Sequence, residues 1–283
     1  MEYRIHKEDL QNDMLAETLQ ALADCYRQIG ADMYIVGAVA RDLASFLLQI
    51  NSTPRRTVDL DVAVLLREWG QYQNLTDILL THHFIKGTEK QRFVYQGEYG
   101  HNCFTVDIVP FGTIADNEQV AWPPEGSPVM SVRCFEEVMQ NADRIVVDDS
   151  YSFYLATLSG QFLIKLDAWQ DRHLRTKKDA TDMVYILQNV YVAYAMTAQS
   201  LPPEIDINAE QFDTLVAGAE WIASDLKRML TDRHRRYYAD MLSAEIAKEE
   251  NSELVNDMID ISDVRNYMLF RRALMRMAQI LAL

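Results

Sequence analysis

The chain has 283 residues, of which 49% are hydrophobic and 24% charged, and its formal net charge is −15 at pH 7. This composition excludes a disordered chain, and the length allows one large or two moderate domains. The negative charge excludes a surface that binds nucleic acid everywhere, because such binding depends on Lys and Arg side chains that neutralise phosphates. A local basic patch is still compatible with this net charge.

The three cysteines, Cys25, Cys103 and Cys134, are widely spaced and have no His at ligand spacing. We therefore expect three reduced thiols, and neither a disulfide framework nor a zinc site. No stretch approaches the roughly 18 apolar residues of a membrane span, and the first residues contain no apolar signal core. We expect no membrane partner and a cytoplasmic location.

The first elements are a helix, a strand and a second helix. Apolar residues recur at helical spacing from Leu10 to Ile29 and predict a helix that ends at Gly30. Met33 to Val36 predicts a strand, and Val39 to Gln49 the helix after it. Gly37 lies at the turn between them, where a residue without Cβ lets a phosphate approach the backbone and the free N–H groups of the helix start attract anions. The turn therefore predicts a phosphate-binding site.

A second apolar strand carries two aspartates. Side chains at i and i+2 share a face, so Leu60 and Val62 can face a core while Asp59 and Asp61 stand side by side on the opposite face. Like charges this close repel each other unless a cation lies between them. Mg²⁺ prefers oxygen ligands, typically one or two carboxylates, with phosphates and waters in its other positions. The strand predicts a site for Mg²⁺ or Mn²⁺; the alternative is that both aspartates are solvated residues on an edge strand.

The next stretch predicts a helix from Tyr72 to His83 and short antiparallel strands at Phe84–Lys86 and Arg92–Tyr95. Cys103 to Val109 alternates between apolar and other residues, which predicts a strand with Asp107 on its polar face. Alone, Asp107 is typical of a residue that forms hydrogen bonds at the end of a strand.

The pattern changes from alternating to helical near Asp148. We place a domain boundary there, which gives domains 1–149 and 150–283, and we expect helices from Tyr151 onward. Lys165 lies among apolar residues on a core-facing helix, where a buried ammonium needs an anionic partner such as a triphosphate. The alternative is a Lys whose stem covers apolar surface and whose head reaches water.

Three motifs resemble the nucleotidyltransferase superfamily. Gly37-Ala38-Val39-Ala40-Arg41-Asp42 resembles the Gly-Gly-x-x-Arg-Asp turn of the tRNA nucleotidyltransferase and poly(A) polymerase branch. Arg55-Arg56-Thr57-Val58-Asp59-Leu60-Asp61 resembles the Arg-x-Thr-x-Asp-x-Asp strand of the AbiEii/AbiGii toxin-like branch. Lys165, followed by Arg175-Thr176-Lys177-Lys178-Asp179, resembles the downstream signature of that branch. Ala38 departs from the usual Gly or Ser, which leaves only backbone contacts to phosphate at that position.

The resemblance implies an α+β fold, in which an α/β nucleotidyltransferase domain with a mixed sheet is followed by an all-helical C-terminal domain, with a nucleoside triphosphate (NTP) in the cleft between them. It implies that Asp59, Asp61 and Asp107 are the catalytic residues and the metal ligands, with general base as an alternative role for Asp107. The residues implied to contact the NTP are Gly37, Ala38, Arg41, Lys165, Arg175 and Lys178.

The implied reaction is the Mg²⁺-dependent transfer of a nucleotidyl group from an NTP to an acceptor hydroxyl, with release of pyrophosphate. The acceptor is open between a tRNA 3′ end, a small molecule and a protein, and a toxin-like role would add an antitoxin partner. A tRNA acceptor requires that Arg172–Lys178 and Arg233–Arg236 form one basic surface; read alone, the first stretch is a solvated helix start. The competing hypothesis is a non-catalytic nucleotide-binding or protein-interaction module on the same fold. A neutralising arginine in the place expected for the magnesium ion would remove the transferase and leave an unassigned α/β domain with a helical tail.

Overall fold

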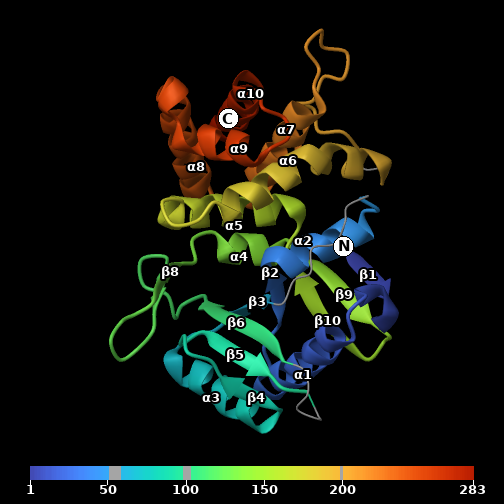
Figure 1. Ribbon diagram of the computed structural model, residues 1–283, viewed down its shortest axis with the longest axis vertical. Coiled ribbons are helices and arrows are strands. Elements are labelled where there is room, and N and C mark those ends of the chain that lie inside the picture. The colour runs from blue at the N-terminus through green and yellow to red at the C-terminus, as the bar shows by residue number, and fades with distance from the viewer. Residues whose placement is uncertain (51–58, 98–102, 198–199) are drawn as a thin grey trace. The chain divides into compact units, whose positions relative to one another are not determined.

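The computed structural model describes residues 1–50, 59–97, 103–197 and 200–283. The chain forms two compact units (Figure 1). The first comprises residues 1–47 and 52–157, and the second comprises residues 48–51 and 158–283. No helix in the described part of the chain is long and apolar enough to cross a membrane.

The first unit is built around a mixed sheet with the strand order β1-β9-β10-β2-β3-β6-β5-β4. Three neighbouring pairs, β1–β9, β10–β2 and β3–β6, are parallel, and the others are antiparallel. The strands of the unit are β1 (Glu2–Ile5), β2 (Tyr34–Val36), β3 (Asp59–Leu65), β4 (Phe84–Lys86), β5 (Arg92–Tyr95), β6 (Phe104–Phe111), β7 (Gln119–Ala121), β8 (Val129–Ser131), β9 (Asp143–Val147) and β10 (Tyr151–Leu155), of which β7 and β8 form a separate pair. Its helices are the 3₁₀ helix η1 (Lys7–Leu10) and α1 (Asp13–Ile29), α2 (Gly37–Leu47), α3 (Trp69–Thr81) and α4 (Phe135–Gln140).

Strand β3 lies inside the sheet, between β2 and β6. Its apolar residues Leu60, Val62 and Val64 are fully buried, whereas Asp59 is exposed. The predicted alternation is therefore confirmed, and β3 is a central strand rather than an edge strand. Helix α1 ends, as expected, at Gly30, whose φ of 65° is a left-handed conformation that a residue without Cβ adopts readily.

Strand β10 corrects the expectation that the chain is helical from Tyr151. Asp148 and Asp149 have φ angles of 48° and 53° and turn the chain from β9 into β10. Asp tolerates this left-handed region because its short polar side chain can hydrogen-bond locally. Since β10 also pairs with β2, the first compact unit continues to Thr157 instead of ending at 149.

The second unit is all-helical in its described residues. It contains α5 (Leu158–Arg172), α6 (Lys178–Met196), α7 (Thr214–Met229), α8 (Asp232–Ala247), the 3₁₀ helix η2 (Glu249–Asn251), α9 (Glu253–Ile261) and α10 (Tyr267–Ala282). Trp221, Tyr238 and Phe270 are among its largest fully buried side chains. The mixed sheet followed by helices confirms the α+β fold class that we expected.

The position of β10 yields a test of whether the first unit folds alone. We expect residues 1–157 to unfold cooperatively on heating, and residues 1–149 to lose that transition, because without β10 nothing joins β9 to β2. Circular dichroism during thermal unfolding measures both. Equal cooperative transitions in the two fragments would show that β10 is dispensable.

Candidate functional site

The three expected aspartates lie on one face of two neighbouring parallel strands. Asp61 on β3 is the register partner of Asp107 on β6, and Asp59 precedes Asp61 by two positions. Register partners on adjacent strands present their side chains on the same face, roughly 4.8 Å apart between strand axes. Asp59 is exposed, whereas Asp61 and Asp107 are half-buried. The structure thus brings the three residues together.

The glycine turn meets these carboxylates directly. Val36, the last residue of β2, is the register partner of Asp61, and Gly37 begins α2 with a φ of 73°. A Cβ at position 37 would lie 2.9 Å from Cγ of Asp61 and closer still to Oδ2. Only a residue without a side chain leaves room for the Asp61 carboxylate here. The turn and the acidic strand therefore form a single site.

Arg92, which the sequence did not single out, completes this face. It lies on β5 as the register partner of Asp107. Its Nε donates to Oδ1 of Asp107 at 2.8 Å, and its Nη2 donates to Oδ2 at 2.8 Å. This bidentate pair raises the pKa of the Arg92 guanidinium, with the hydrogen bonds to Asp107 as the largest cause. Asp107 is thus already paired with a cation.

The fit to a divalent cation is therefore uneven across the three aspartates. Asp59 and Asp61 offer carboxylate oxygens of the kind that Mg²⁺ prefers, and their role as ligands stays a prediction. Asp107 does not fit as a further ligand while both of its oxygens accept hydrogen bonds from Arg92. Its expected role as a metal ligand stays a prediction that requires the pair to open.

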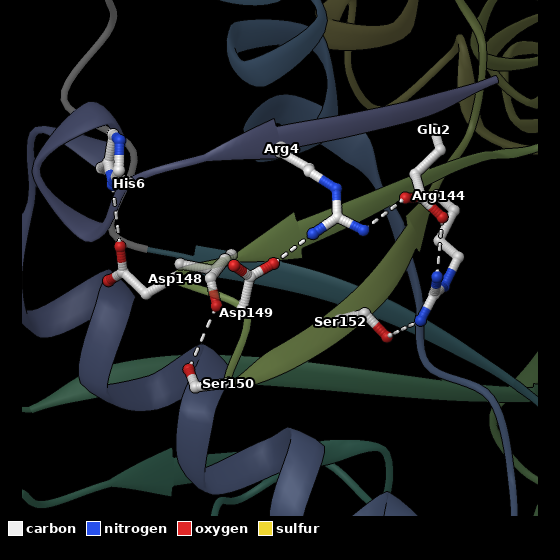
Figure 2. A network of polar contacts seen from close by, with 9 residues as sticks. Glu2, Arg4, His6, Arg144, Asp148, Asp149, Ser150 and Ser152 are labelled. Atoms are coloured by element: carbon white, nitrogen blue, oxygen red, sulfur yellow. Dashed lines mark hydrogen bonds and ion pairs between the residues drawn. The ribbon is translucent and has the colours of Figure 1, made fainter.

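A different group of residues meets a geometric test for metal ligation. Among the described residues, one ligand atom each from His6, Glu8 and Asp148 lie within 4.8 Å of one another, whereas Asp59, Asp61 and Asp107 do not form such a group. The hydrogen bond between His6 Nδ1 and Asp148 Oδ1, 3.0 Å long, raises the pKa of His6. Figure 2 shows this pair beside the ion pair of Arg4 with Asp149. All three members of the group are exposed, as expected of a solvated acidic surface.

Arg41 is buried in α2. Its Nε and Nη2 donate to Oδ1 of the neighbouring Asp42 at 3.0 and 2.6 Å. A contact of Arg41 with a nucleotide would compete with this pair. Ala38, in the first turn of the same helix, is half-buried and offers only its backbone. The roles of both residues toward an NTP stay predictions.

Lys165 on α5 has its anionic partners within the second unit. Its Nζ lies 2.9 Å from Asp182 Oδ2 and 3.5 Å from Asp179 Oδ1, both on α6. Asp179 is fully buried and also accepts two hydrogen bonds from Arg172, at 2.7 and 2.8 Å. The anion that a buried ammonium requires is therefore supplied by the protein itself.

Arg175 and Lys178 differ from Lys165. Both are exposed, and their side chains form no hydrogen bond or ion pair with the part of the chain that the structure describes. Between them, Lys177 lies 3.0 Å from Asp257 and 2.7 Å from Asp260, which raise its pKa. The basic stretch is thus partly neutralised, and the two unneutralised side chains stand at either side of Lys177.

Comparisons with known proteins leave the family open. No protein-family model matches the sequence. A search of curated proteins finds no match. Among solved structures, the chain is similar to a CCA-adding enzyme of Thermotoga maritima complexed with tRNA, at 10% sequence identity and a TM-score of 0.32, over 94% of this chain and 67% of the enzyme's. A TM-score this low does not establish a shared fold.

The contact between Gly37 and Asp61 predicts a specific defect. Gly37→Ala forces Asp61 to rotate away from the turn, so we expect Mn²⁺ binding, measured by electron paramagnetic resonance, to weaken about 10-fold. Gly30→Ala is the matched control, since Gly30 has a similar φ of 65° but nothing within 4 Å of an added Cβ. Both variants should lose about 1–2 kcal/mol of stability from the left-handed backbone. Equal Mn²⁺ affinity in the two would contradict the close approach.

The pairing of Lys165 predicts a loss of stability. Lys165→Met removes the ammonium beside two poorly exposed carboxylates, of which Asp179 keeps its pair with Arg172, and we expect the free energy of unfolding in urea to fall by about 1–3 kcal/mol. Lys178→Met, which removes an exposed and unpaired ammonium, should change it by no more than about 0.5 kcal/mol. A small effect of Lys165→Met would show that Lys165 is available for another anion.

Proposed function

We propose that this protein transfers a nucleotidyl group from an NTP to an acceptor hydroxyl and depends on a divalent cation, Mg²⁺ or Mn²⁺. The observation that carries the proposal is the approach of the Asp61 carboxylate to the Gly37 turn. It unites the start of a helix, where backbone N–H groups attract phosphates, with a strand whose carboxylates suit a hard cation. Neither element alone would distinguish this site from a solvated surface.

Each part of the site has a distinct role in the proposed reaction. The N–H groups at the start of α2 bind phosphate oxygens through the backbone alone, because Ala38 has no hydroxyl. Asp59 and Asp61 would hold the cation, which neutralises phosphate charge when bound. The acceptor hydroxyl gives up its proton to solvent, its oxygen forms a bond to the α-phosphorus, the bond from that phosphorus to the bridging oxygen breaks, and pyrophosphate leaves. Catalysis rests on positioning and charge.

A role of Arg175 and Lys178 in binding phosphate is a finer part of the proposal. Arg175 and Lys178 are suited to bind phosphate because both are exposed and unpaired among the described residues. Lys165 is less suited, since Asp179 and Asp182 already surround its ammonium.

The acceptor that we propose to test first is the 3′ end of a tRNA. Tyr237 at α8 donates to Gln170 on α5 at 2.9 Å, which brings the basic start of α8 close to the end of α5. A tRNA-binding surface from Arg172–Lys178 and Arg233–Arg236 is compatible with that contact. The ion pairs of Arg172 and Lys177 weaken such a surface, so a small molecule or a protein remains the alternative acceptor. A toxin role, with an antitoxin partner, would follow only from tRNA modification.

The Arg92–Asp107 pair favours a second candidate function. A face with a permanent guanidinium beside its carboxylates can bind a nucleotide without catalysing transfer. The chain would then be a non-catalytic nucleotide-binding or protein-interaction module. This candidate predicts that labelled NTP is retained on a filter with the protein while no label reaches any acceptor.

Transfer of label distinguishes the two candidates. We expect the full-length protein, incubated with each α-labelled NTP, Mg²⁺ and total RNA or lysate, to produce labelled acceptor, and Asp59→Asn to lower the rate by about 100-fold or more. Asp240→Asn, an exposed aspartate on α8, is the matched control and should transfer at the wild-type rate. Label that is absent with the wild type, or unchanged in Asp59→Asn, would remove the transferase.

A further inference from the structure

We infer that a pocket beside α4, at the carboxyl ends of β3 and β6, binds the base of the NTP. This α4 pocket has a volume of about 260 Å³ and lies within the first unit. Among the residues that line it are Tyr34, Leu65, Phe111, Arg67, Glu136 and Gln140. The inference rests on the proposed function, because the base belongs to the same substrate, but it does not depend on which side chains hold a cation.

The floor of the α4 pocket is aromatic and apolar. Tyr34, Leu65 and Phe111 line it from the sheet, and Met139 lines it from α4. Tyr34 is half-buried and Leu65 is 49% exposed, so both offer surface to a ligand. Phe135 of α4 contacts Phe111 at a distance of 5.8 Å between ring centroids, which holds α4 beside the end of β6. Nucleobases have flat faces that stack on aromatic side chains and pack against apolar ones.

The rim of the pocket carries three polar side chains that are not engaged elsewhere. Arg67, Glu136 and Gln140 are exposed, and their side chains form no hydrogen bond or ion pair with the residues that the structure describes. An Arg side chain only donates, a Glu carboxylate only accepts, and a Gln amide does both. The edge of every nucleobase carries donors as well as acceptors, so this rim can satisfy it. A purely apolar ligand would leave all three groups unused.

The size of the pocket favours a base over a whole nucleotide. Sites that enclose a drug-sized ligand have volumes of roughly 300–1,000 Å³. At about 260 Å³, the α4 pocket has room for one flat ring system. The ribose and the phosphates of a bound NTP must therefore lie outside it.

The pocket opens on the face of the sheet that carries the aspartates. Leu65 follows Asp61 by four positions on β3, so it shares that face at a distance of about 13 Å along the strand. Tyr34 lies closer, because it is the register partner of Ala63, which is about 7 Å from Asp61. In the other direction, Asp61 meets the Gly37 turn. A base against Tyr34 therefore leaves its ribose and α-phosphate between the pocket and the proposed phosphate site.

Binding of nucleosides tests the inference without a metal ion and without transfer. Adenosine, guanosine, cytidine and uridine are titrated separately into the full-length protein in the absence of divalent cations, and binding is measured by saturation-transfer NMR. We expect at least one nucleoside to bind, and the NTP with the same base to displace it. Leu65→Ala and Glu136→Ala should each raise its Kd by about 10-fold, because they remove part of the floor and of the rim.

Each variant has a matched control in the same unit. Leu80→Ala on α3 truncates a leucine of similar exposure, 46%, and Glu17→Ala on α1 removes an exposed carboxylate. Neither residue lines the α4 pocket, so both controls should bind the nucleoside with the wild-type Kd. Circular dichroism verifies that all four variants are folded.

The outcomes separate this inference from the proposed function. No binding of any of the four nucleosides, no displacement by the NTP, or the same Kd in Leu65→Ala as in Leu80→Ala overturns the inference, whatever the transfer of label shows. Nucleoside binding that Leu65→Ala and Glu136→Ala weaken supports it. If the wild type then transfers no label, the α4 pocket stands and the transferase is removed.

Discussion

Negative charge gathered on one face of a sheet has to be compensated, and the bidentate bond between Arg92 and Asp107 is the compensation that this chain provides. It fixes Asp107, one of the two half-buried members of the acidic face, whereas Asp59 is exposed. Asp61 lies level with Asp107 on the neighbouring strand and against the Gly37 turn. The proposed phosphate site is therefore next to a carboxylate whose charge Arg92 already compensates.

That turn depends on the order of the strands. Because β2 and β3 are antiparallel neighbours, the end of β2 lies beside the aspartates of β3, and the chain enters α2 at that point. β3 and β6 are parallel, which sets Asp61 level with Asp107. A shift of one residue in either register would turn one carboxylate to the opposite face of the sheet. The candidate site is thus a product of the sheet's topology, and the left-handed glycine is the local adjustment that makes the topology compatible with a carboxylate so close.

Sequence reasoning reached the aspartates because their placement follows from the period of a strand. Alternation assigned Asp59, Asp61 and Asp107 to polar faces, and helical periodicity found α1 and most of the C-terminal helices. Register is not encoded in such a period, so the sequence did not reveal that Arg92 lies opposite Asp107. The turn at Asp148 and Asp149 was also missed, since its backbone requires left-handed residues that asparagine and glycine usually supply. Asp residues in that conformation resemble a solvated linker when only the sequence is known.

The basic groups of the second unit show the same limit of sequence reasoning, because a sequence does not reveal which residues pair. A lysine among apolar residues predicts an anion, but it does not say which anion, and here α6 provides it through Asp179 and Asp182, which are three positions apart on one helix face. Arg172 binds the same Asp179, so one buried carboxylate ties the middle and the C-terminal end of α5 to α6. A motif that resembles a phosphate-binding signature can therefore persist because it holds two helices together. A side chain that is exposed and has no partner among the described residues is therefore a better candidate to bind a triphosphate than one that only matches a motif. Arg175 and Lys178 meet both conditions, and Lys165 meets neither.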